Sequence, residues 1–265
     1  VLHRLEPTGL VPRLRGRSGR WLIQEYVAGD RLSVALDRAD AAEAAALLAR
    51  GAEALVALQQ AGNAAGLSDL APVIGAREGW LDDLLDAPAR LGAALGLTVP
   101  AFDRAAASAL LAPGAPRFVK WDARPGNALL RPDGTICWFD WEHCGCRQPT
   151  DDLAWLLADE WAPESPAAET ASLDAVARVH GTAPGSLRDR FRAMAVFHSA
   201  IRLGLILAAR GDRGWRSHAE ALARDRIGAT APLAARTADR AARWAGETAP
   251  LRPLSGFFEE VRLTV

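Results

Sequence analysis

Two short motifs govern what we expect of this chain: Lys120-Trp121-Asp122-Ala123-Arg124-Pro125-Gly126-Asn127 and, a little further on, Phe139-Asp140-Trp141-Glu142. Asn127 follows Asp122 by five positions, and Asp140 follows Asn127 by thirteen. Carboxylate and amide oxygens of this kind accept protons or bind a hard metal ion. The motifs are therefore candidates for a chemical site, provided that the fold brings them together.

The segment between the motifs predicts a β-hairpin. Ala128–Leu130 and Thr135–Phe139 are short apolar runs, and Arg131-Pro132-Asp133-Gly134 separates them. Asp-Gly between two such runs is a strong signal of a hairpin turn. A hairpin of this length returns Asp140 to the side of Asn127, as two ligands of one metal ion require.

Kinase-type phosphoryl-transfer enzymes place their chemical groups in this order. One carboxylate receives the proton of the substrate hydroxyl, while an amide oxygen and a second carboxylate hold Mg²⁺ on the ATP phosphates. On this pattern Asp122 is the candidate base, and Asn127 and Asp140 are the candidate Mg²⁺ ligands. The alternative is structural, with Asp122 and Asn127 making turn hydrogen bonds and Asp140 ending a strand.

The combined motifs resemble those of the aminoglycoside phosphotransferase and choline kinase branch of the protein-kinase-like superfamily. The loop of that family typically reads His-Gly-Asp-x-x-x-Gly-Asn, and its metal motif reads Ile-Asp-[Phe/Trp]-Glu, followed by Gly and then Asp-Leu-Ala. The resemblance has motif support over roughly residues 1–165. The matching positions of this chain are Asp122, Pro125-Gly126-Asn127, Phe139-Asp140-Trp141-Glu142, Gly145 and Asp152-Leu153-Ala154.

The resemblance implies an α+β, protein-kinase-like fold. Residues 1–29 would be a remnant of the N-terminal lobe, with a β-hairpin and the interlobe hinge, and residues 30–265 a mainly helical C-terminal lobe with the catalytic loop and the metal-binding hairpin. The implied activity is the transfer of the γ-phosphoryl group of ATP, with Mg²⁺, to a hydroxyl of a small molecule. Aminoglycosides, sugars, amino alcohols and related metabolites are the implied acceptors.

The segment Trp21-Leu22-Ile23-Gln24-Glu25-Tyr26-Val27-Ala28-Gly29 resembles the strand and hinge that join the two lobes of the family. In that resemblance Glu25, Tyr26 and Val27 bind ATP, and main-chain groups near Glu25 and Val27 bond the adenine edge. Side-chain identity matters less at such positions. The alternative is an edge strand that ends at a glycine turn.

Two basic residues of the first motif have expected roles toward the nucleotide. Arg124 stands where protein kinases carry a lysine that touches the transferred phosphoryl group, and a guanidinium there would neutralise developing charge. A solvated loop arginine is the alternative. Lys120 replaces the His of the family, and Trp121 replaces its Gly. We expect Lys120 either to reach Asp140 or the ATP phosphates, or to pack its stem under the loop with its amine at water.

Part of the family pattern is not found in this sequence. Lys120 is the only lysine, so residues 1–119 lack the strand lysine that normally holds the ATP phosphates, and they lack a Gly-x-Gly-x-x-Gly loop. The chain also begins with Val1. We expect either a fragment without the first strands of the small lobe, or a shortened protein. The second account allows a catalytically inactive, kinase-like nucleotide-binding or regulatory module.

Composition narrows the partners and the location. Half of the 265 residues are apolar and the formal net charge is −1, so charge does not favour nucleic acid or an acidic membrane as a partner. A continuous run of about 18 apolar residues, which would indicate a membrane span, does not occur. A basic start followed by an apolar segment is also lacking. We therefore expect a cytoplasmic protein with no membrane span.

Periodicity predicts the other elements. We expect strands over 11–17 and 20–27, with Ser18-Gly19 between them. Asp40 is the expected N-cap of a long helix over 41–61, whose apolar stripe packs into the large lobe. Further helices are expected over 78–95, 102–112, 152–160, 167–179, 187–210, 215–226 and 229–246.

Overall fold

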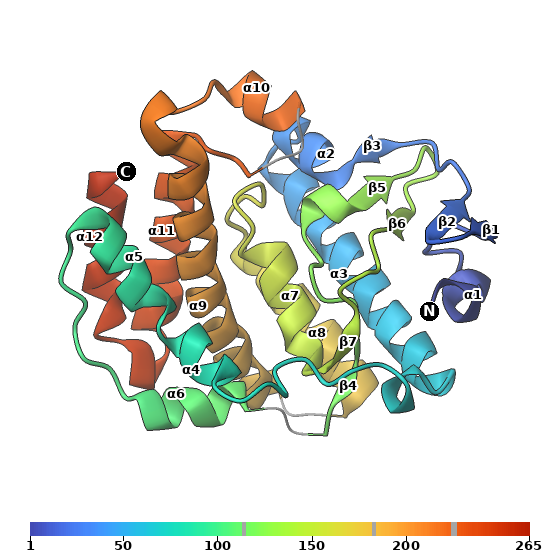
Figure 1. The fold of residues 1–265 in the computed structure, drawn as a ribbon, viewed down its shortest axis with the longest axis horizontal. Coiled ribbons are helices and arrows are strands. Elements are labelled where there is room, and N and C mark those ends of the chain that lie inside the picture. Colours follow the sequence, from blue (N-terminus) through green and yellow to red (C-terminus); the bar gives the residue numbers. More distant parts are fainter. Residues whose placement is uncertain (113–114, 182–183, 224–226) are drawn as a thin grey trace. The chain divides into compact units, whose positions relative to one another are not determined.

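The computed structural model describes residues 1–112, 115–181, 184–223 and 227–265, and the chain divides into two compact units (Figure 1). The first unit consists of residues 1–74, 113–156 and 165–182, and the second of residues 75–112, 157–164 and 183–265. Both motifs and the expected hinge belong to the first unit. Short strands and many helices confirm the predicted α+β class. The lobe boundary at residue 29 stays a prediction.

The strands of the first unit form small antiparallel sheets. The hairpin expected near the N-terminus is confirmed, because β1 (Leu14–Ser18) pairs with β2 (Trp21–Gln24). In a second sheet β5 (Ala128–Leu130) lies between β3 (Asp30–Arg31) and β6 (Ile136–Trp138). β4 (Arg117–Val119) pairs with β7 (Gly145–Arg147). The helices of this unit are α1 (Leu2–Leu5), α2 (Leu32–Arg38), α3 (Ala41–Ala64), α7 (Pro149–Leu157) and α8 (Pro166–His180).

The long helix α3 is the main support of the first unit. Asp40 caps it as predicted, because its side chain accepts a 2.9 Å hydrogen bond from the Glu43 N–H. Its apolar stripe is buried, and Leu48 and Leu55 are fully buried. This face packs against α8 and β4 (Figure 1). Near its end, Gly62 lies directly against the ring of Phe118 on β4.

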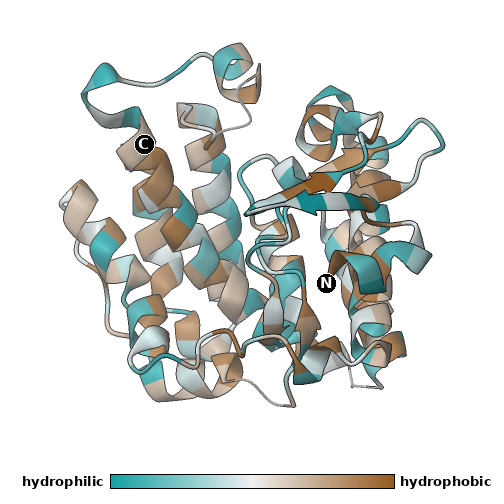
Figure 2. Cartoon of the chain, turned by 45° about the vertical axis from the view of Figure 1, so that its right-hand side comes forward, coloured by the Kyte–Doolittle hydropathy of each residue, from teal (hydrophilic) through white to brown (hydrophobic). Residues whose placement is uncertain are grey.

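The second unit is helical in its described residues. Its longest helix, α9 (Pro184–Arg210), packs against three others, α5 (Ala87–Leu95), α6 (Arg104–Leu111) and α11 (Ala231–Gly246). The unit also contains α4 (Trp80–Leu85), α10 (His218–Ala223) and α12 (Leu254–Thr264). Hydrophobic and hydrophilic residues alternate around the helices (Figure 2), the pattern of helices that bury one face.

The helical stretch Gly185–Arg213 is long and apolar enough, by length and composition, to cross a membrane. The absence of an unbroken apolar run does not exclude a span, since a few charged residues are tolerated in one. The packing of α9 gives the better criterion, because 67% of the apolar window is buried inside the protein. This burial is typical of the core helix of a globular unit.

Several element boundaries differ from the predicted ones. The helix expected over 78–95 is two helices, since α4 ends before Asp86 and α5 begins at Ala87 with Pro88 in its first turn. A proline ring is tolerated in a first turn but not in the interior of a continuous helix. The helix expected over 152–160 begins earlier, at Pro149, and ends at Leu157. Of the span expected over 215–226, α10 covers His218–Ala223, and residues 224–226 lie outside the described residues. Helices α2 and α12 were not predicted.

Candidate active site

The first motif forms the loop that follows β4, and Asp152 on α7 holds its beginning. The Asp152 carboxylate accepts hydrogen bonds from the main-chain N–H groups of Lys120 (2.9 Å) and Trp121 (2.7 Å) and from the side chain of Gln59 (2.9 Å). Burial raises the pKa of Asp152, and the hydrogen bonds from these donors act in the opposite direction. Asp152 therefore braces the loop.

Three residues of the motifs adopt the left-handed backbone that residues with a side chain rarely take. The φ angle is 51° at Trp121, 47° at Asp122 and 58° at Asp140. Each such residue costs about 1–2 kcal/mol, so neighbouring contacts must hold the conformation. For Trp121, which replaces a glycine of the family, one contact is its ring packed edge-on against Trp155, with centroids 5.5 Å apart. Backbone strain of this kind tends to collect at functional sites.

Asp122 and Asn127 are in direct contact. The Asn127 Nδ2 atom donates to Asp122 Oδ2 at 2.7 Å and to the Asp122 carbonyl at 3.0 Å. The predicted hairpin is confirmed, because β5 pairs with β6 and the Phe139 N–H donates to the Asn127 carbonyl at 3.0 Å. Asp140 thus directly follows a residue that is bonded to Asn127. The fold brings the three oxygen-bearing residues of the two motifs into one region.

The ammonium group of Lys120 lies between the two motifs. Its Nζ atom donates to the Asp140 carbonyl at 2.9 Å and to the Asp122 carbonyl at 3.3 Å. Lys120 is only 1% exposed, so its amine does not lie at water. Burial lowers the pKa of Lys120 to about 8, while the nearby carboxylates act to raise it. One expectation was that Lys120 reaches Asp140. It does so, but its ammonium bonds the main-chain carbonyl of Asp140 and not the carboxylate.

The atoms of Asn127 and Asp140 suit a magnesium ion. Because the Asn127 amide nitrogen is committed to Asp122, its Oδ1 oxygen is the atom left to face a cation. Asp140 supplies a carboxylate and lines a cavity of about 550 Å³ together with Glu142. Mg²⁺ binds oxygen ligands and is commonly held by one or two protein groups, with water and substrate phosphates completing the shell. The residues present fit this mode of binding.

Arg124 lies two residues after Asp122, at the start of a 3-10 turn over Pro125–Asn127. Its carbonyl accepts the Asn127 N–H at 2.9 Å, which ties it to the candidate metal ligand. The Arg124 side chain is half-buried, and its Nε and Nη2 atoms are shielded from solvent. The guanidinium is therefore an inner part of the loop, not a solvated surface group.

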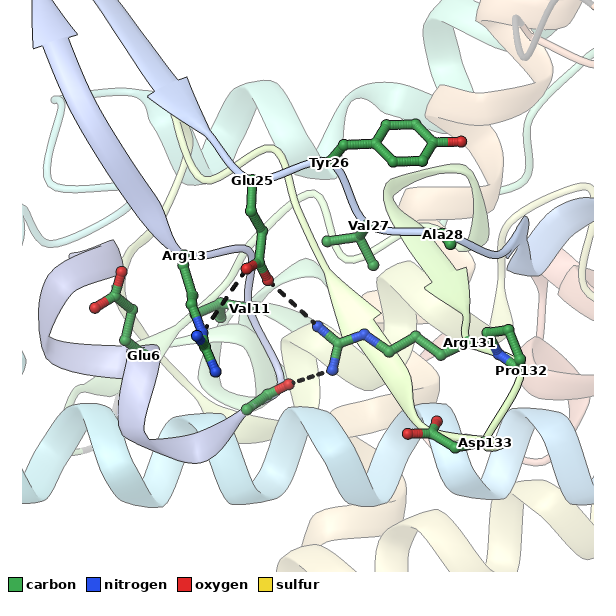
Figure 3. Close-up of a pocket in the computed structure, with 11 residues that line it drawn as sticks. Glu6, Val11, Arg13, Glu25, Tyr26, Val27, Ala28, Arg131, Pro132 and Asp133 are labelled. Carbon is green, nitrogen blue, oxygen red and sulfur yellow. Dashed lines mark hydrogen bonds and ion pairs between the residues drawn. The ribbon is translucent and has the colours of Figure 1, made fainter.

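Glu25, Tyr26 and Val27 form an extended segment after β2. The Glu25 N–H donates to the Arg13 carbonyl at 2.9 Å, so a hydrogen bond from this residue to a base must use its carbonyl. Arg13 and Arg131 both point toward the Glu25 carboxylate (Figure 3), at 3.7 and 3.9 Å. The Tyr26 side chain points away and is 93% exposed. The Glu25 side chain is thus engaged by arginines and that of Tyr26 faces solvent, which leaves the main-chain groups of these two residues to meet a ligand.

These hinge residues line two cavities. The cavity of about 490 Å³ drawn in Figure 3 lies beside the β5–β6 turn. The other, of about 400 Å³, is lined by residues that include the apolar Leu129 and Phe139. Gln24 lines this second cavity and also the cavity that contains Asp140. The second cavity is therefore the one that adjoins the candidate metal ligands.

Leu129 and Phe139 were not among the candidates predicted from the sequence. They lie on the hairpin that carries the candidate metal ligands, Leu129 in β5 and Phe139 directly before Asp140. An apolar wall of this kind suits the face of a planar base. The sequence did contain a signal for these two residues. Apolar residues on a short hairpin next to a candidate metal motif face either the core or a ligand.

Comparison with known proteins agrees with this architecture. The sequence matches the phosphotransferase enzyme family over residues 1–189. No match was found among the curated proteins. The fold is similar to the solved structure of an aminoglycoside phosphotransferase from Alicyclobacillus acidocaldarius, at a TM-score of 0.55 and 14% identity, covering 98% of this chain and 81% of that one.

A choline/ethanolamine kinase family protein from Mesorhizobium loti also matches, at a TM-score of 0.49 and 14% identity, over 99% of this chain and 82% of that one. The family match extends over well more than half of the chain and includes both motifs, the hinge segment and Asp152. The chain therefore belongs to the phosphotransferase enzyme family, and its fold is the kinase-like one that the motifs predicted.

Proposed function

We propose that this protein is an ATP- and Mg²⁺-dependent phosphotransferase that moves the γ-phosphoryl group to a hydroxyl of a small molecule, such as an aminoglycoside, a sugar, an amino alcohol or a related metabolite. The observation that supports the proposal most directly is the contact of Asn127 with Asp122, with the Asp140 main chain joined to the same place through Lys120. Because the proposed phosphoryl donor is ATP, we place the protein in the cytoplasm.

In this proposal the purine lies in the cavity of about 400 Å³, against Leu129 and Phe139. The Glu25 carbonyl and main-chain groups of Val27 bond its edge. The phosphates extend past Gln24, which lines both cavities, toward Asp140. The proposed nucleotide site thus lies entirely within the first unit.

Asp122 is the proposed acid–base residue of the reaction. Its contact with Asn127 fixes the carboxylate beside the proposed metal position, where it orients the acceptor hydroxyl and receives its proton. Asn127 Oδ1 and the Asp140 carboxylate would hold Mg²⁺, which when bound neutralises charge on the phosphate oxygens. Arg124 offers a further positive charge to the transferring group.

Replacement of the proposed base tests the mechanism. In Asp122→Ala we expect turnover to fall by about 10²–10⁴-fold, since a positioned general base contributes roughly that factor, while Mg²⁺–ATP still binds. Release of ADP with a panel of hydroxyl compounds measures turnover, and calorimetry measures binding. Asp133→Ala, which removes an exposed carboxylate from the β5–β6 turn, is the matched control and should keep full activity.

The outcomes of this experiment separate the proposal from its alternative. An Asp122→Ala protein with undiminished turnover would exclude the assigned role. Wild-type protein that binds Mg²⁺–ATP but phosphorylates no compound of the panel would instead support an inactive nucleotide-binding or regulatory module. Absence of any nucleotide binding by the wild type would refute both.

A further inference from the structure

Lys120 has contacts that neither a phosphate ligand nor a solvated loop residue would have. Its ammonium donates to two main-chain carbonyls, those of Asp140 and Asp122, at 2.9 and 3.3 Å. The rings of Trp138 and Trp141 lie with their centroids 5.8 and 5.4 Å from the same nitrogen. An ammonium group shielded from water is costly unless hydrogen bonds and aromatic faces replace its hydration. Both kinds of partner are present here.

The two carbonyl acceptors belong to residues with strained backbone. Asp122 and Asp140 both have positive φ angles, 47° and 58°, and the direction of each carbonyl follows from that conformation. A cation that bonds both carbonyls favours the backbone in which they converge, and it opposes relaxation of either loop to an ordinary conformation. Lys120 is also the residue whose own N–H is bonded to Asp152, so both of its ends are fixed.

The position of the amine argues against direct contact with the ATP phosphates. With 1% of the residue exposed, Lys120 could meet a phosphate only by leaving both carbonyls and both tryptophan rings. A compact ammonium with three donors fits this place. The rest of the chain uses arginine as its strong base, and Lys120 is the single lysine.

We infer that Lys120 is a positioning residue, whose ammonium joins the main chain of Asp122 to that of Asp140 and so sets the distance between the acid–base carboxylate and the metal-binding carboxylate. The inference rests on the proposed function. It assigns Lys120 no contact with the nucleotide and no part in proton transfer. It also explains how a lysine takes the place of the family's histidine without loss of the architecture around the two motifs.

Replacement by methionine gives the first test, because Lys120→Met keeps an unbranched stem and removes the charge. We expect kcat to fall by about 10–100-fold, the usual effect of losing a group that orients metal ligands, and the Mg²⁺ concentration for half-maximal activity to rise. The affinity for ATP measured without Mg²⁺ should not change. If ATP affinity without metal falls while the Mg²⁺ requirement stays as in the wild type, Lys120 is a phosphate ligand and the inference is wrong.

Arg50→Met is the matched control, because it also removes a cation bonded to a main-chain carbonyl, that of Gly134 at 3.2 Å, on the outer face of α3. Its kcat and Mg²⁺ requirement should equal those of the wild type. A Lys120→Met protein whose rate per folded molecule and Mg²⁺ requirement both match those of Arg50→Met would reduce Lys120 to a packing residue and overturn the inference.

A measurement on the unaltered protein covers the case in which Lys120→Met does not fold. Since the chain has one lysine, selective ¹⁵N-lysine labelling gives a single side-chain ammonium signal in NMR. We expect slow exchange of its protons with water, and little change of the signal when ATP is added without Mg²⁺. Fast exchange, or a large change on ATP binding alone, would contradict the inference. This test does not require turnover, so it stands apart from a failure of the proposed function.

Discussion

Asp152 shows how one buried side chain can organise a loop that the backbone alone would not form. Its carboxylate accepts from two successive main-chain N–H groups, those of Lys120 and Trp121, and from Gln59. It is fully buried, as are Lys120 and Gln59, so these two donors have no water to turn to instead. The left-handed conformation of Trp121 follows directly after the first of these bonds, which places the brace where the strain begins.

Removal of the Asp152 carboxylate should therefore affect both stability and rate. In Asp152→Ala each buried donor left without an acceptor costs about 1–3 kcal/mol, and the loop that carries Asp122 is released. We expect a lower free energy of unfolding in urea and a lower turnover per folded molecule. Gln59→Leu is the control, since it removes one donor but leaves both bonds to the loop, and it should lose stability without losing rate. Equal rates in the two variants would show that Asp152 does not shape the loop.

At the residue scale, the sequence predicted that Asp140 lies beside Asn127. The short segment between them contains one turn signal, and a hairpin with that turn brings its two ends together. The sequence did not predict the partners of Lys120. Those partners are main-chain carbonyls, whose direction depends on positive φ angles at Asp122 and Asp140. Aspartate adopts such angles more readily than most residues but is not required to do so, and at Trp121 the preference of a bulky side chain opposes them. Tertiary contacts decide these details.

At the scale of an element, helix α3 also combines features that the sequence predicts with features that only tertiary contacts decide. Two glycines lie inside it, and the sequence gives no reason to treat them differently. In the structure a Cβ atom on Gly51 would meet Leu156 at an ordinary contact distance of 3.4 Å, whereas one on Gly62 would overlap the ring of Phe118. Phe118 is fully buried on β4, and its ring is stacked with that of Trp141. Gly62 is thus required by close approach of the strand, and Gly51 is not.

The two glycines give a matched pair of substitutions. Gly51→Ala should stabilise the protein by up to about 1 kcal/mol, because alanine is the better helix former and the site accepts a methyl group. Gly62→Ala should destabilise it by about 1–3 kcal/mol through overpacking. Thermal or urea unfolding measures both. A destabilised Gly51→Ala, or a Gly62→Ala of unchanged stability, would mean that α3 and β4 do not pack as described.

Elements with strong local signals were predicted, and elements that depend on packing were not. The cap at Asp40 and the stripe of α3 gave its start and nearly its full length, Ala41–Ala64. The turn at Arg131–Gly134 gave the β5–β6 hairpin. Helix α12 was missed although its four buried residues, Leu254, Phe257, Phe258 and Val261, recur at helical spacing, because no side-chain cap marks its start.

On the scale of the whole molecule, the composition does not reveal which charged residues are buried. A net charge of −1 and 24% charged residues are ordinary values, yet each unit encloses an ion pair. In the first unit Arg147 Nε bonds Asp151 Oδ2 at 2.6 Å, with side-chain exposures of 2% and 3%. In the second unit, Arg202 donates two hydrogen bonds to the fully buried carboxylate of Glu160, from Nη2 to Oε1 at 2.6 Å and from Nε to Oε2 at 2.9 Å. The first of these pairs links global stability to pH.

The Arg147–Asp151 pair gives a pH dependence of stability with a definite sign. Burial raises the pKa of Asp151 from 3.8 to about 6, although the charge of Arg147 lowers it. Between these values the folded protein binds more protons at this site than the unfolded chain does. The stability that the raised pKa of Asp151 adds to the folded protein is therefore fully present below pH 3.8, and it is lost as the pH rises through about 6. Asp151→Asn cannot titrate, so its stability lacks this contribution at every pH.

The free energy of unfolding of the wild type minus that of Asp151→Asn, measured in urea at several values between pH 4 and pH 7.5, isolates the effect, because all other groups titrate in both proteins. We expect this difference to decrease steadily as the pH rises toward about 6 and to level off above it. A difference that increases over the same range would mean that Arg147 outweighs burial and holds the pKa of Asp151 below its ordinary value. The sign of one slope thus decides whether desolvation or ion pairing governs this buried pair.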